Sequence, residues 1–285
     1  MKQNFLIAVL LSLAASAATA ADAPGAKPAA AKAAAAPAAK SGAAQAEVVS
    51  APKLSMEQVV ERNVTARGGL AAWRAMNAMT LTGDMDAGGK QNTALPFTMI
   101  LKRPNLSRLE LKFQEQTAVQ VFDGKQGWKF RPFLGRNEVE SYTPAELKSA
   151  AAATDLDAPL INYAARGAKV ELQGVEAVEG KAAYKLKLTR KTGEQVSVWV
   201  DAASFLDVKM DGEPRRMDGR VRKVAVYYRD FKKVSGLTLP HLTETVVDGV
   251  PGSHKMVVKT AAVNPPLEAS LFAKPQAAVA KASAK

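Results

Sequence analysis

Apolar residues along the chain change their spacing near Met76. From Leu54 to Met76 they recur every three to four positions, with one interruption at Gly68-Gly69. This period predicts two consecutive helices. Beyond Met76, apolar and polar residues alternate over many short stretches, and this period of two predicts β-strands.

The first helix begins with a strong capping signal. Ser55 is the expected N-cap, Gln58 can return its hydrogen bond, and Leu54 can pack against Val59. Gly68 supplies the left-handed residue that ends the helix near Arg67. The apolar side chains of the second, shorter helix share one side and are expected to cover a sheet: Leu70, Trp73 and Met76.

The glycine pair is not expected to bind phosphate. A phosphate loop follows a strand and leads into Lys-Ser or Lys-Thr. Here a helix precedes the glycines and Leu70-Ala71 follows them. The pair therefore predicts a helical bend that places Trp73 on an apolar surface.

The remaining elements follow from alternation and turn signals. Strands are predicted over 79–87, 94–103, 106–113, 117–124 and 127–133. Thr143 and Pro144 begin an alanine-rich helix over 143–153. Further strands are predicted over 168–178, 182–190, 194–201, 205–211, 220–231, 237–249 and 255–263.

These elements define the expected fold class. The connections are too short for parallel crossovers, so neighbouring strands should run antiparallel. We expect an α+β fold in which helices lie on one face of a strongly curved antiparallel sheet. One face of such a sheet is apolar and the other is solvated.

Both ends of the chain differ from this pattern. Residues 1–20 hold Lys2, a short apolar run and Ala18-Thr19-Ala20, which together predict a signal peptide cleaved after Ala20 rather than a retained membrane anchor. Residues 21–53 and 274–285 are rich in Ala, Pro and Lys and are expected to be a disordered tether and tail. One domain over 54–273 remains, and the absence of cysteine favours a soluble periplasmic protein.

Positive charge is concentrated in one stretch of the domain. The chain carries +12, and +3 from residues 1–53 with +3 from 274–285 leaves +6, of which 209–233 supply +5. Four arginines of this stretch are candidates for contact with anionic lipid headgroups: Arg215, Arg216, Arg220 and Arg222. The alternative is a solvated strand edge whose charges deter aggregation. An exported protein is not expected to bind nucleic acid.

Catalytic and metal-binding patterns are missing from the sequence. The chain has two histidines and no cysteine. His241 and Glu244 stand three apart on a predicted strand and so point to opposite faces. No nucleophile elbow is present and no motif pairs two carboxylates. The sequence therefore predicts a protein that is not an enzyme and that binds no metal or cofactor.

The order of segments resembles the LolA/LolB-like superfamily of periplasmic lipoprotein-sorting and carrier proteins. The resemblance covers about residues 58–273. It is carried by "RGGLAAWRAMNAMTLTG", "VFDGKQGWKFRPF", "VEGKAAYKLKLTRKTGEQVSVWVDAASFLDVKM", "LTLPHLTETVVDG" and "NPPLEASLF". It implies an unclosed β-barrel whose concave side, beneath its helices, holds the acyl chains of a lipoprotein or another lipid.

The alternating apolar residues of the strands also predict an apolar face that could hold such a ligand. Alternating apolar side chains on strands make either solid core or the wall of a pocket. The candidate cavity residues are Phe97, Met99, Leu101, Leu109, Leu111, Phe113, Trp128, Phe130, Tyr184, Leu186 and Leu188.

Two functions stay open at this point. One is a monomeric carrier or receptor for lipid or lipoprotein acyl chains, which meets membrane proteins as donor or acceptor. The other is a periplasmic sensor of the same fold that regulates a membrane protein partner. Bound lipid would favour the first, and a stable protein complex without lipid would favour the second.

Overall fold

The computed structural model of the protein describes residues 50–86, 93–153, 155–217 and 219–276. The expected signal peptide over 1–20 lies outside the described residues. Nearly all of the expected tether and most of the expected tail lie outside them as well.

Two helices open the described part, as the sequence predicts. They are α2 (Met56–Ala66) and α3 (Leu70–Ala75). The amide of Gln58 donates to Ser55 Oγ at 3.2 Å, and the amide of Ser55 donates to Gln58 Oε1 at 2.9 Å, so the predicted capping box is confirmed. Gly68 ends α2 with a φ of 109°.

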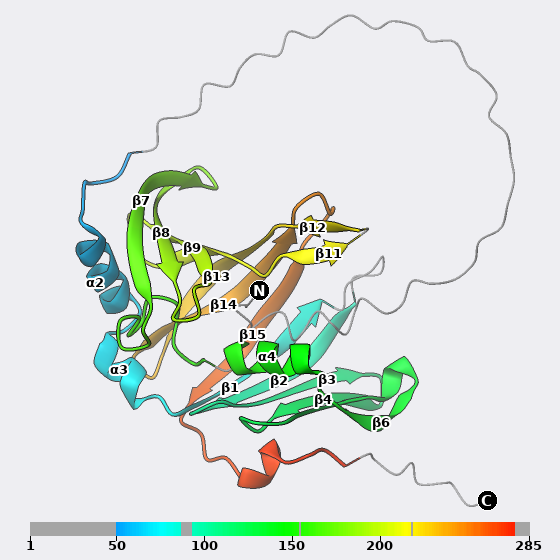
Figure 1. Cartoon of the computed structure of the whole chain (residues 1–285). Coiled ribbons are helices and arrows are strands. Elements are labelled where there is room, and N and C mark those ends of the chain that lie inside the picture. The colour runs from blue at the N-terminus through cyan, green and yellow to red at the C-terminus, as the bar shows by residue number, and fades with distance from the viewer. Residues whose placement is uncertain (1–49, 87–92, 154, 218, 277–285) are drawn as a thin grey trace, which may run out of the picture.

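Thirteen strands of the described residues form one antiparallel sheet (Figure 1). Its first half comprises β1 (Ala78–Asp86), β2 (Ala94–Lys102), β3 (Leu106–Phe113), β4 (Gln116–Phe122), β5 (Gly127–Arg131) and β6 (Arg136–Ser141). Its second half comprises β7 (Lys169–Val178), β8 (Lys181–Thr189), β9 (Gln195–Asp201), β10 (Asp207–Asp211), β13 (Val224–Val234), β14 (Leu237–Val247) and β15 (His254–Val263).

The order across the sheet is β6-β5-β4-β3-β2-β1-β15-β14-β13-β10-β9-β8-β7. Its two halves therefore meet where β1 pairs with β15, and the sheet bends strongly between them (Figure 1). Because β6 and β7 stand at opposite edges, the sheet is not closed.

Shorter elements complete the described chain. The 3-10 turn η1 (Pro132–Leu134) and helix α4 (Pro144–Ala153) flank β6. Strands β11 (Arg215–Met217) and β12 (Arg220–Arg222) form a separate two-stranded hairpin that projects from the second half (Figure 1). A last 3-10 turn, η2 (Ala269–Phe272), follows β15.

Most predicted elements are confirmed within a few residues. The sequence prediction missed β6, because Arg136–Ser141 is largely polar and exposed. It also treated 220–231 as one strand, whereas the structure separates β12 from β13 at Lys223 and pairs β12 with β11.

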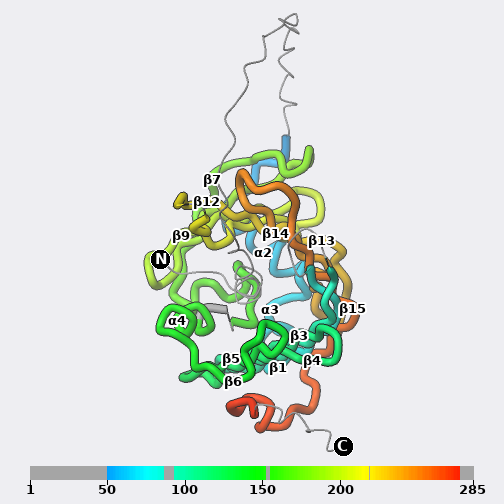
Figure 2. Tube along the Cα trace, turned by 90° about the vertical axis from the view of Figure 1, so that its right-hand side faces the viewer, coloured from blue at the N-terminus to red at the C-terminus, as the bar shows by residue number. Residues whose placement is uncertain are grey.

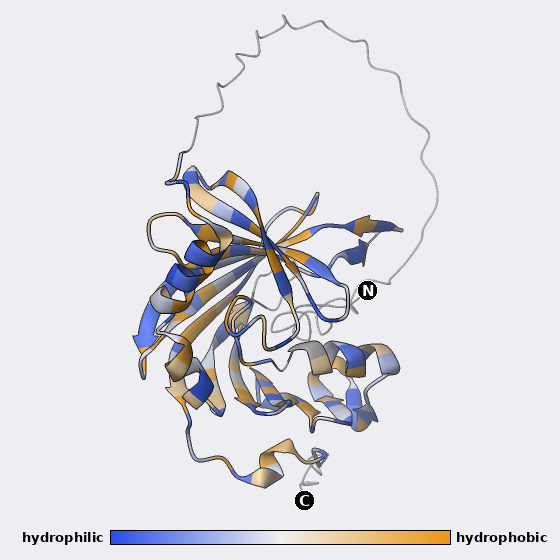
Figure 3. Ribbon diagram, turned by 60° about the vertical axis from the view of Figure 1, so that its left-hand side comes forward, coloured by the Kyte–Doolittle hydropathy of each residue, from blue (hydrophilic) through white to orange (hydrophobic). Residues whose placement is uncertain are grey.

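Register places the apolar side chains on a shared inner face. Leu81 faces Met99 across the β1–β2 pair, and Met99 faces Leu109 across the β2–β3 pair. In the second half, Leu186 faces Val198 across the β8–β9 pair. Polar residues alternate with these positions, as the changing colours along each strand show (Figure 3).

Two buried clusters lie on this inner face. The cluster of the first half includes Trp73 of α3 together with Leu156 and Ile161 from the segment between α4 and β7. The cluster of the second half includes Val59 of α2 and Leu160 of that same segment. Segment 155–168 therefore contacts both halves of the core.

Candidate functional site

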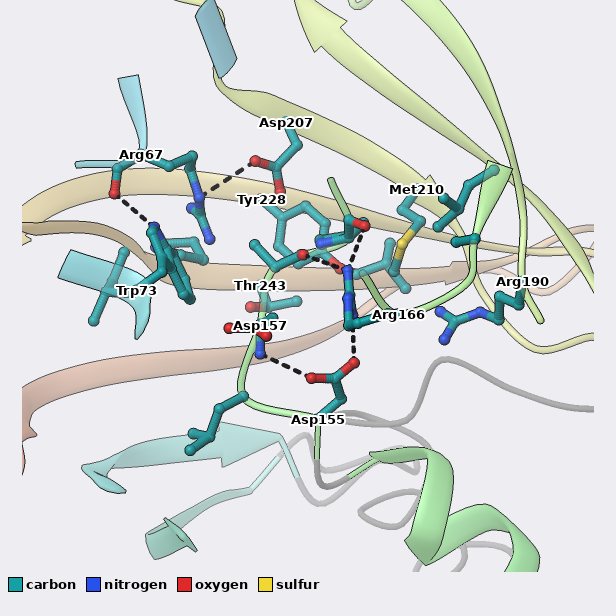
Figure 4. Close-up of a pocket in the computed structure, with 18 of the residues that line it drawn as sticks. Arg67, Trp73, Asp155, Asp157, Arg166, Arg190, Asp207, Met210, Tyr228 and Thr243 are labelled. Carbon is teal, nitrogen blue, oxygen red and sulfur yellow. Dashed lines mark hydrogen bonds and ion pairs between the residues drawn. The ribbon is translucent and has the colours of Figure 1, made fainter. Parts of the chain in front are cut away.

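A cavity of about 590 Å³ lies on the inner face, between the two clusters (Figure 4). This volume is within the range of small-molecule sites in proteins. Strands from both halves of the sheet supply its floor, which is apolar except for Thr243 and the Tyr228 hydroxyl. The floor residues are Met79, Leu81, Leu188, Met210, Val226, Tyr228, Leu239, Thr243, Met256 and Val258.

Segment 155–168 forms one wall of the cavity. Asp157 accepts from Arg103 Nη2 at 2.6 Å, and Arg103 Nε donates to the carbonyl of Met76 at 2.8 Å. Arg166 pairs with Asp155, and its Nη2 donates to the carbonyl of Pro159 at 2.8 Å. These contacts fix an irregular segment against both α3 and the sheet.

Arg67 occupies the wall formed by the end of α2. Its side chain is buried, and its Nε lies 3.4 Å from Asp207 Oδ1. The guanidinium carbon lies 5.2 Å from the ring centre of Trp73 and 5.5 Å from that of Phe231. The Trp73 indole in turn donates to the carbonyl of Arg67 at 3.0 Å. The bend at Gly68 thus brings Arg67 and Trp73 together at the cavity.

Charged side chains surround the apolar floor. The cationic lining residues are Arg67, Lys148, Arg166, Arg190 and Lys191, and the acidic ones are Asp155, Asp157, Glu194 and Asp207. Burial lowers the pKa of Arg190, and nearby Arg166 adds to this effect, while Glu194 opposes it. Burial also raises the pKa of Tyr228 above its ordinary range, helped by the negative charge of Asp207. The site therefore combines apolar surface with buried charge.

Two of the predicted residues, Trp73 and Leu188, line this cavity. The other predicted residues of β2, β3 and β8 are packed beside it in the two clusters: Phe97, Met99, Leu101, Leu109, Leu111, Tyr184 and Leu186. Met76 is buried in the first cluster, and Leu70 packs against it. Phe113 is more exposed and makes an edge contact with Phe133 at 5.8 Å between ring centres.

Trp128 and Phe130 lie on the opposite face of the sheet. Trp128 faces Val121 and Phe130 faces Val119, and these belong to a separate cluster with Phe272. The inner face of β5 instead carries Lys129, whose Nζ lies 2.6 Å from Glu146 of α4. Alternation predicts two faces of β5 but not which of them turns inward, so the sequence reading placed these aromatic residues on the wrong side.

The four predicted headgroup arginines lie on the β11–β12 hairpin. Arg216 and Arg220 are exposed, whereas Arg215 and Arg222 are partly buried. Arg222 Nη1 donates to the carbonyl of Asp248 at 3.1 Å, which ties the hairpin to the turn after β14. Val221 of the same hairpin is 64% exposed.

The sequence reading missed several cavity residues. Arg67 was taken only as the end of a helix, because a charged residue is usually exposed. Segment 155–168 was left unassigned because it has neither helical nor strand periodicity. One signal in the sequence could have indicated the cavity. Three methionines that line it stand at apolar positions of alternating strands: Met79, Met210 and Met256.

Two further observations concern metal-ligating side chains and helix length in the described residues. The described part of the chain brings no three His, Cys, Asp or Glu side chains together as a metal site. Among the described helices, none is both long and apolar enough to cross a membrane.

An open, bent antiparallel sheet with a cavity on its inner face defines a class of β-sheet proteins whose sheet does not close into a barrel. Within this class the chain has the LolA-like fold. It is similar to a LolA superfamily protein from Nitrosomonas europaea, at 14% identity and a TM-score of 0.51, over 78% of this chain and 99% of that one. The predicted resemblance is therefore confirmed at the level of the fold.

A second solved structure also has a similar fold. A DUF1329 family protein from Desulfovibrio piger matches at 14% identity and a TM-score of 0.53, over 76% of this chain and 96% of that one. No family model matches the chain. No curated protein matches it either.

Proposed function

We propose that this protein is a periplasmic carrier or receptor, without catalytic activity, for the acyl chains of a lipoprotein or a similar apolar ligand. The observation that carries the proposal is the cavity of about 590 Å³ with a floor of apolar side chains from both halves of the sheet. In this role the helices and segment 155–168 cover the concave face. The buried residues of β2, β3 and β8 form the bed beneath the ligand.

The energetics suit transfer rather than permanent storage. Burying one methylene contributes about 0.8 kcal/mol, so a chain of about 14 carbons gains on the order of 10 kcal/mol over water. A bilayer offers the same chain a similar gain. A cavity with an apolar floor and no covalent anchor therefore keeps loading and release close to balance.

The proposal also includes export of the protein to the periplasm. Residues 1–20 act as a signal peptide, and 21–53 act as a tether that lets the domain stand away from a surface. N-terminal sequencing of periplasmic protein should begin at Ala21. A sequence beginning at Met1 in the membrane fraction would contradict this part of the proposal.

The test of function compares two neighbouring valines of β15. Val258 lines the cavity, whereas Val257 is 41% exposed. Val258→Phe should fill part of the cavity and weaken the binding of a fluorescent fatty-acid probe at least several-fold. Val257→Phe, which adds the same side chain outside the cavity, should leave probe binding unchanged.

Mass spectrometry of gently purified wild-type protein should detect co-purified lipid, and circular dichroism should show that both variants fold. If the wild type carries no lipid and does not enhance the probe, the carrier function is wrong. The regulatory-partner function would then take its place.

A further inference from the structure

Arg67 has hydrogen-bonding capacity that the described protein does not use. A guanidinium has five N–H donors. Within the described ranges, Nε and Nη1 of Arg67 are buried and donate no hydrogen bond, and the whole residue is only 4% exposed. Asp207 lies 3.4 Å from Nε, close enough for an ion pair but not in hydrogen-bond geometry. Leaving donors of a buried charged group unsatisfied is costly.

Among the described residues, the neighbours of Arg67 supply no hydrogen-bond acceptor to its Nε or Nη1. Trp73 and Phe231 both lie within 5.5 Å of the guanidinium carbon, in positions suited to cation–π contact. Asn63 Nδ2 also donates a hydrogen bond to Asp207 Oδ1, at 3.4 Å. A held guanidinium with unused donors is suited to bind an oxygen acceptor.

Two other arginines that line the cavity also have a buried donor without a hydrogen-bond acceptor in the described part of the chain. In the described residues, Nε of Arg166 and Nε of Arg190 are also buried without a hydrogen bond. Figure 4 shows these three arginines spread across the pocket, with Arg67 and Trp73 at one end and Arg190 at the other. A ligand with an oxygen acceptor at one end and a hydrocarbon chain would match both the arginines and the apolar floor.

The acidic residues restrict what this acceptor can be. Asp155, Asp157, Glu194 and Asp207 line the same cavity as the arginines. A doubly charged phosphate would meet these carboxylates at short range, where like charges repel strongly. A neutral or singly charged oxygen meets less repulsion and still accepts from Arg67.

We propose that the cavity binds an acyl lipid with its carbonyl oxygen at Arg67 and its hydrocarbon chain on the apolar floor. This inference rests on the proposed function and narrows its ligand class. A fatty-acid carboxylate and a fatty ester share the carbonyl oxygen, and both satisfy Arg67. The hydrocarbon chain alone does not.

The experiment compares three ligands with the same twelve-carbon chain. Dodecanoic acid, its methyl ester and dodecane are used to displace a fluorescent probe from the wild-type protein. The acid, the ester or both should bind at least tenfold more tightly than dodecane. The tighter binder of the two shows whether the site prefers a free fatty-acid carboxylate or a fatty ester. Equal binding of all three would overturn this inference and leave the carrier function standing. If none of the three ligands binds, both this inference and the carrier function are wrong.

Variants then assign the preference to Arg67. Arg67→Met combined with Asp207→Asn removes the donors without leaving a buried carboxylate unpaired, so the preference should disappear while dodecane binding persists. Asp207→Asn alone keeps Arg67 and should keep the preference. A preference that survives in the double variant would overturn the inference.

A measurement on the wild type covers the case in which the double variant does not fold. The infrared band of a ¹³C-labelled ester carbonyl should shift to lower wavenumber on binding, because a charged donor polarises the C=O bond. An unshifted band in bound ester would show that the carbonyl oxygen has no hydrogen bond and would likewise overturn the inference.

Discussion

Gly68 and Gly69 are adjacent and both have positive φ, at 109° and 85°, yet their surroundings differ. A Cβ on Gly68 would overlap the carbonyl oxygen of Gly236 and lie 3.0 Å from Leu237 Cα. A Cβ on Gly69 would meet nothing within 4 Å. The close approach at Gly68 holds the end of α2 against Gly236 and the start of β14, where the amide of Thr238 donates to the carbonyl of Arg67.

Gly68→Ala should therefore be much more damaging than Gly69→Ala. Both changes strain a left-handed residue, which costs roughly 1–2 kcal/mol. The backbone overlap at Gly68 adds to this strain, so its total loss should exceed about 3 kcal/mol. Urea unfolding measures both, and equal losses would show that the turn at Gly236 yields to the new side chain.

Glu244 should make stability depend on pH. A hydrogen bond from Ser253 Oγ at 2.5 Å lowers the pKa of Glu244 below its ordinary value of 4.5, and Arg229 and Lys255 add to this effect against burial. A lowered pKa stabilises the folded state above 4.5, and this stability is lost as pH falls through the folded-state pKa. Ser253→Ala should cost about 1 kcal/mol at pH 7.

The cost of Ser253→Ala should shrink as the carboxyl becomes protonated. Urea unfolding at pH 7 and at successively lower pH measures this change. A loss that stays constant across the range would mean that the Ser253 hydroxyl stabilises the fold without acting through the charge of Glu244.

At the scale of elements, the β11–β12 hairpin combines exposed arginines with exposed apolar side chains. Arg216 and Arg220 are exposed, and Met217 and Val221 are 36% and 64% exposed. A projecting hairpin of this composition is suited to an anionic lipid surface, where each arginine contributes about 1 kcal/mol.

The double variant Arg216→Ser/Arg220→Ser should bind vesicles containing phosphatidylglycerol about tenfold or more weakly than the wild type, because about 2 kcal/mol is lost. Lys112→Ser/Lys233→Ser changes net charge equally at exposed sites outside the hairpin and should have little effect. Vesicle binding that is insensitive to lipid charge and to salt would dismiss the headgroup contact.

The predictability of the elements follows from their periodicity. Strands such as β3 and β14 alternate regularly and were predicted close to their bounds, because one of their faces is buried. Segment 155–168 is just as central, yet its buried Leu156, Leu160 and Ile161 follow no single period. Burial of Arg67 depends on partners far apart in sequence, Asp207 and Phe231. Local pattern therefore predicted most of the sheet and missed most of the cavity wall.

At the scale of the whole molecule, the sheet is covered on both faces in its first half. Beyond β15 the chain turns under β1–β5 and ends the described domain (Figures 1 and 2). Phe272 packs there with Ile100, Val121 and Phe130, and Arg108 Nη1 donates to the carbonyl of Leu271 at 3.0 Å. This C-terminal cover shares no residue with the lining of the cavity.

Phe272→Ala should therefore destabilise the domain without altering ligand preference. Loss of a buried phenyl ring costs about 3–5 kcal/mol, and less where the site can relax. Urea unfolding measures the loss, and probe binding under native conditions should match the wild type. A change in probe affinity would mean that the outer face and the cavity are coupled through the sheet.

The central pairing of β1 with β15 also governs how the chain can fold. Met79, in the first strand of the sheet along the chain, is the register partner of Val263 in the last strand, so no local hairpin can form this pair. Closing so long a loop has a large entropic cost, and folds rich in such contacts form slowly. During synthesis the two halves of the sheet remain unjoined until the last strand has emerged. The chain therefore stays open for longest at the seam over which its cavity is later built.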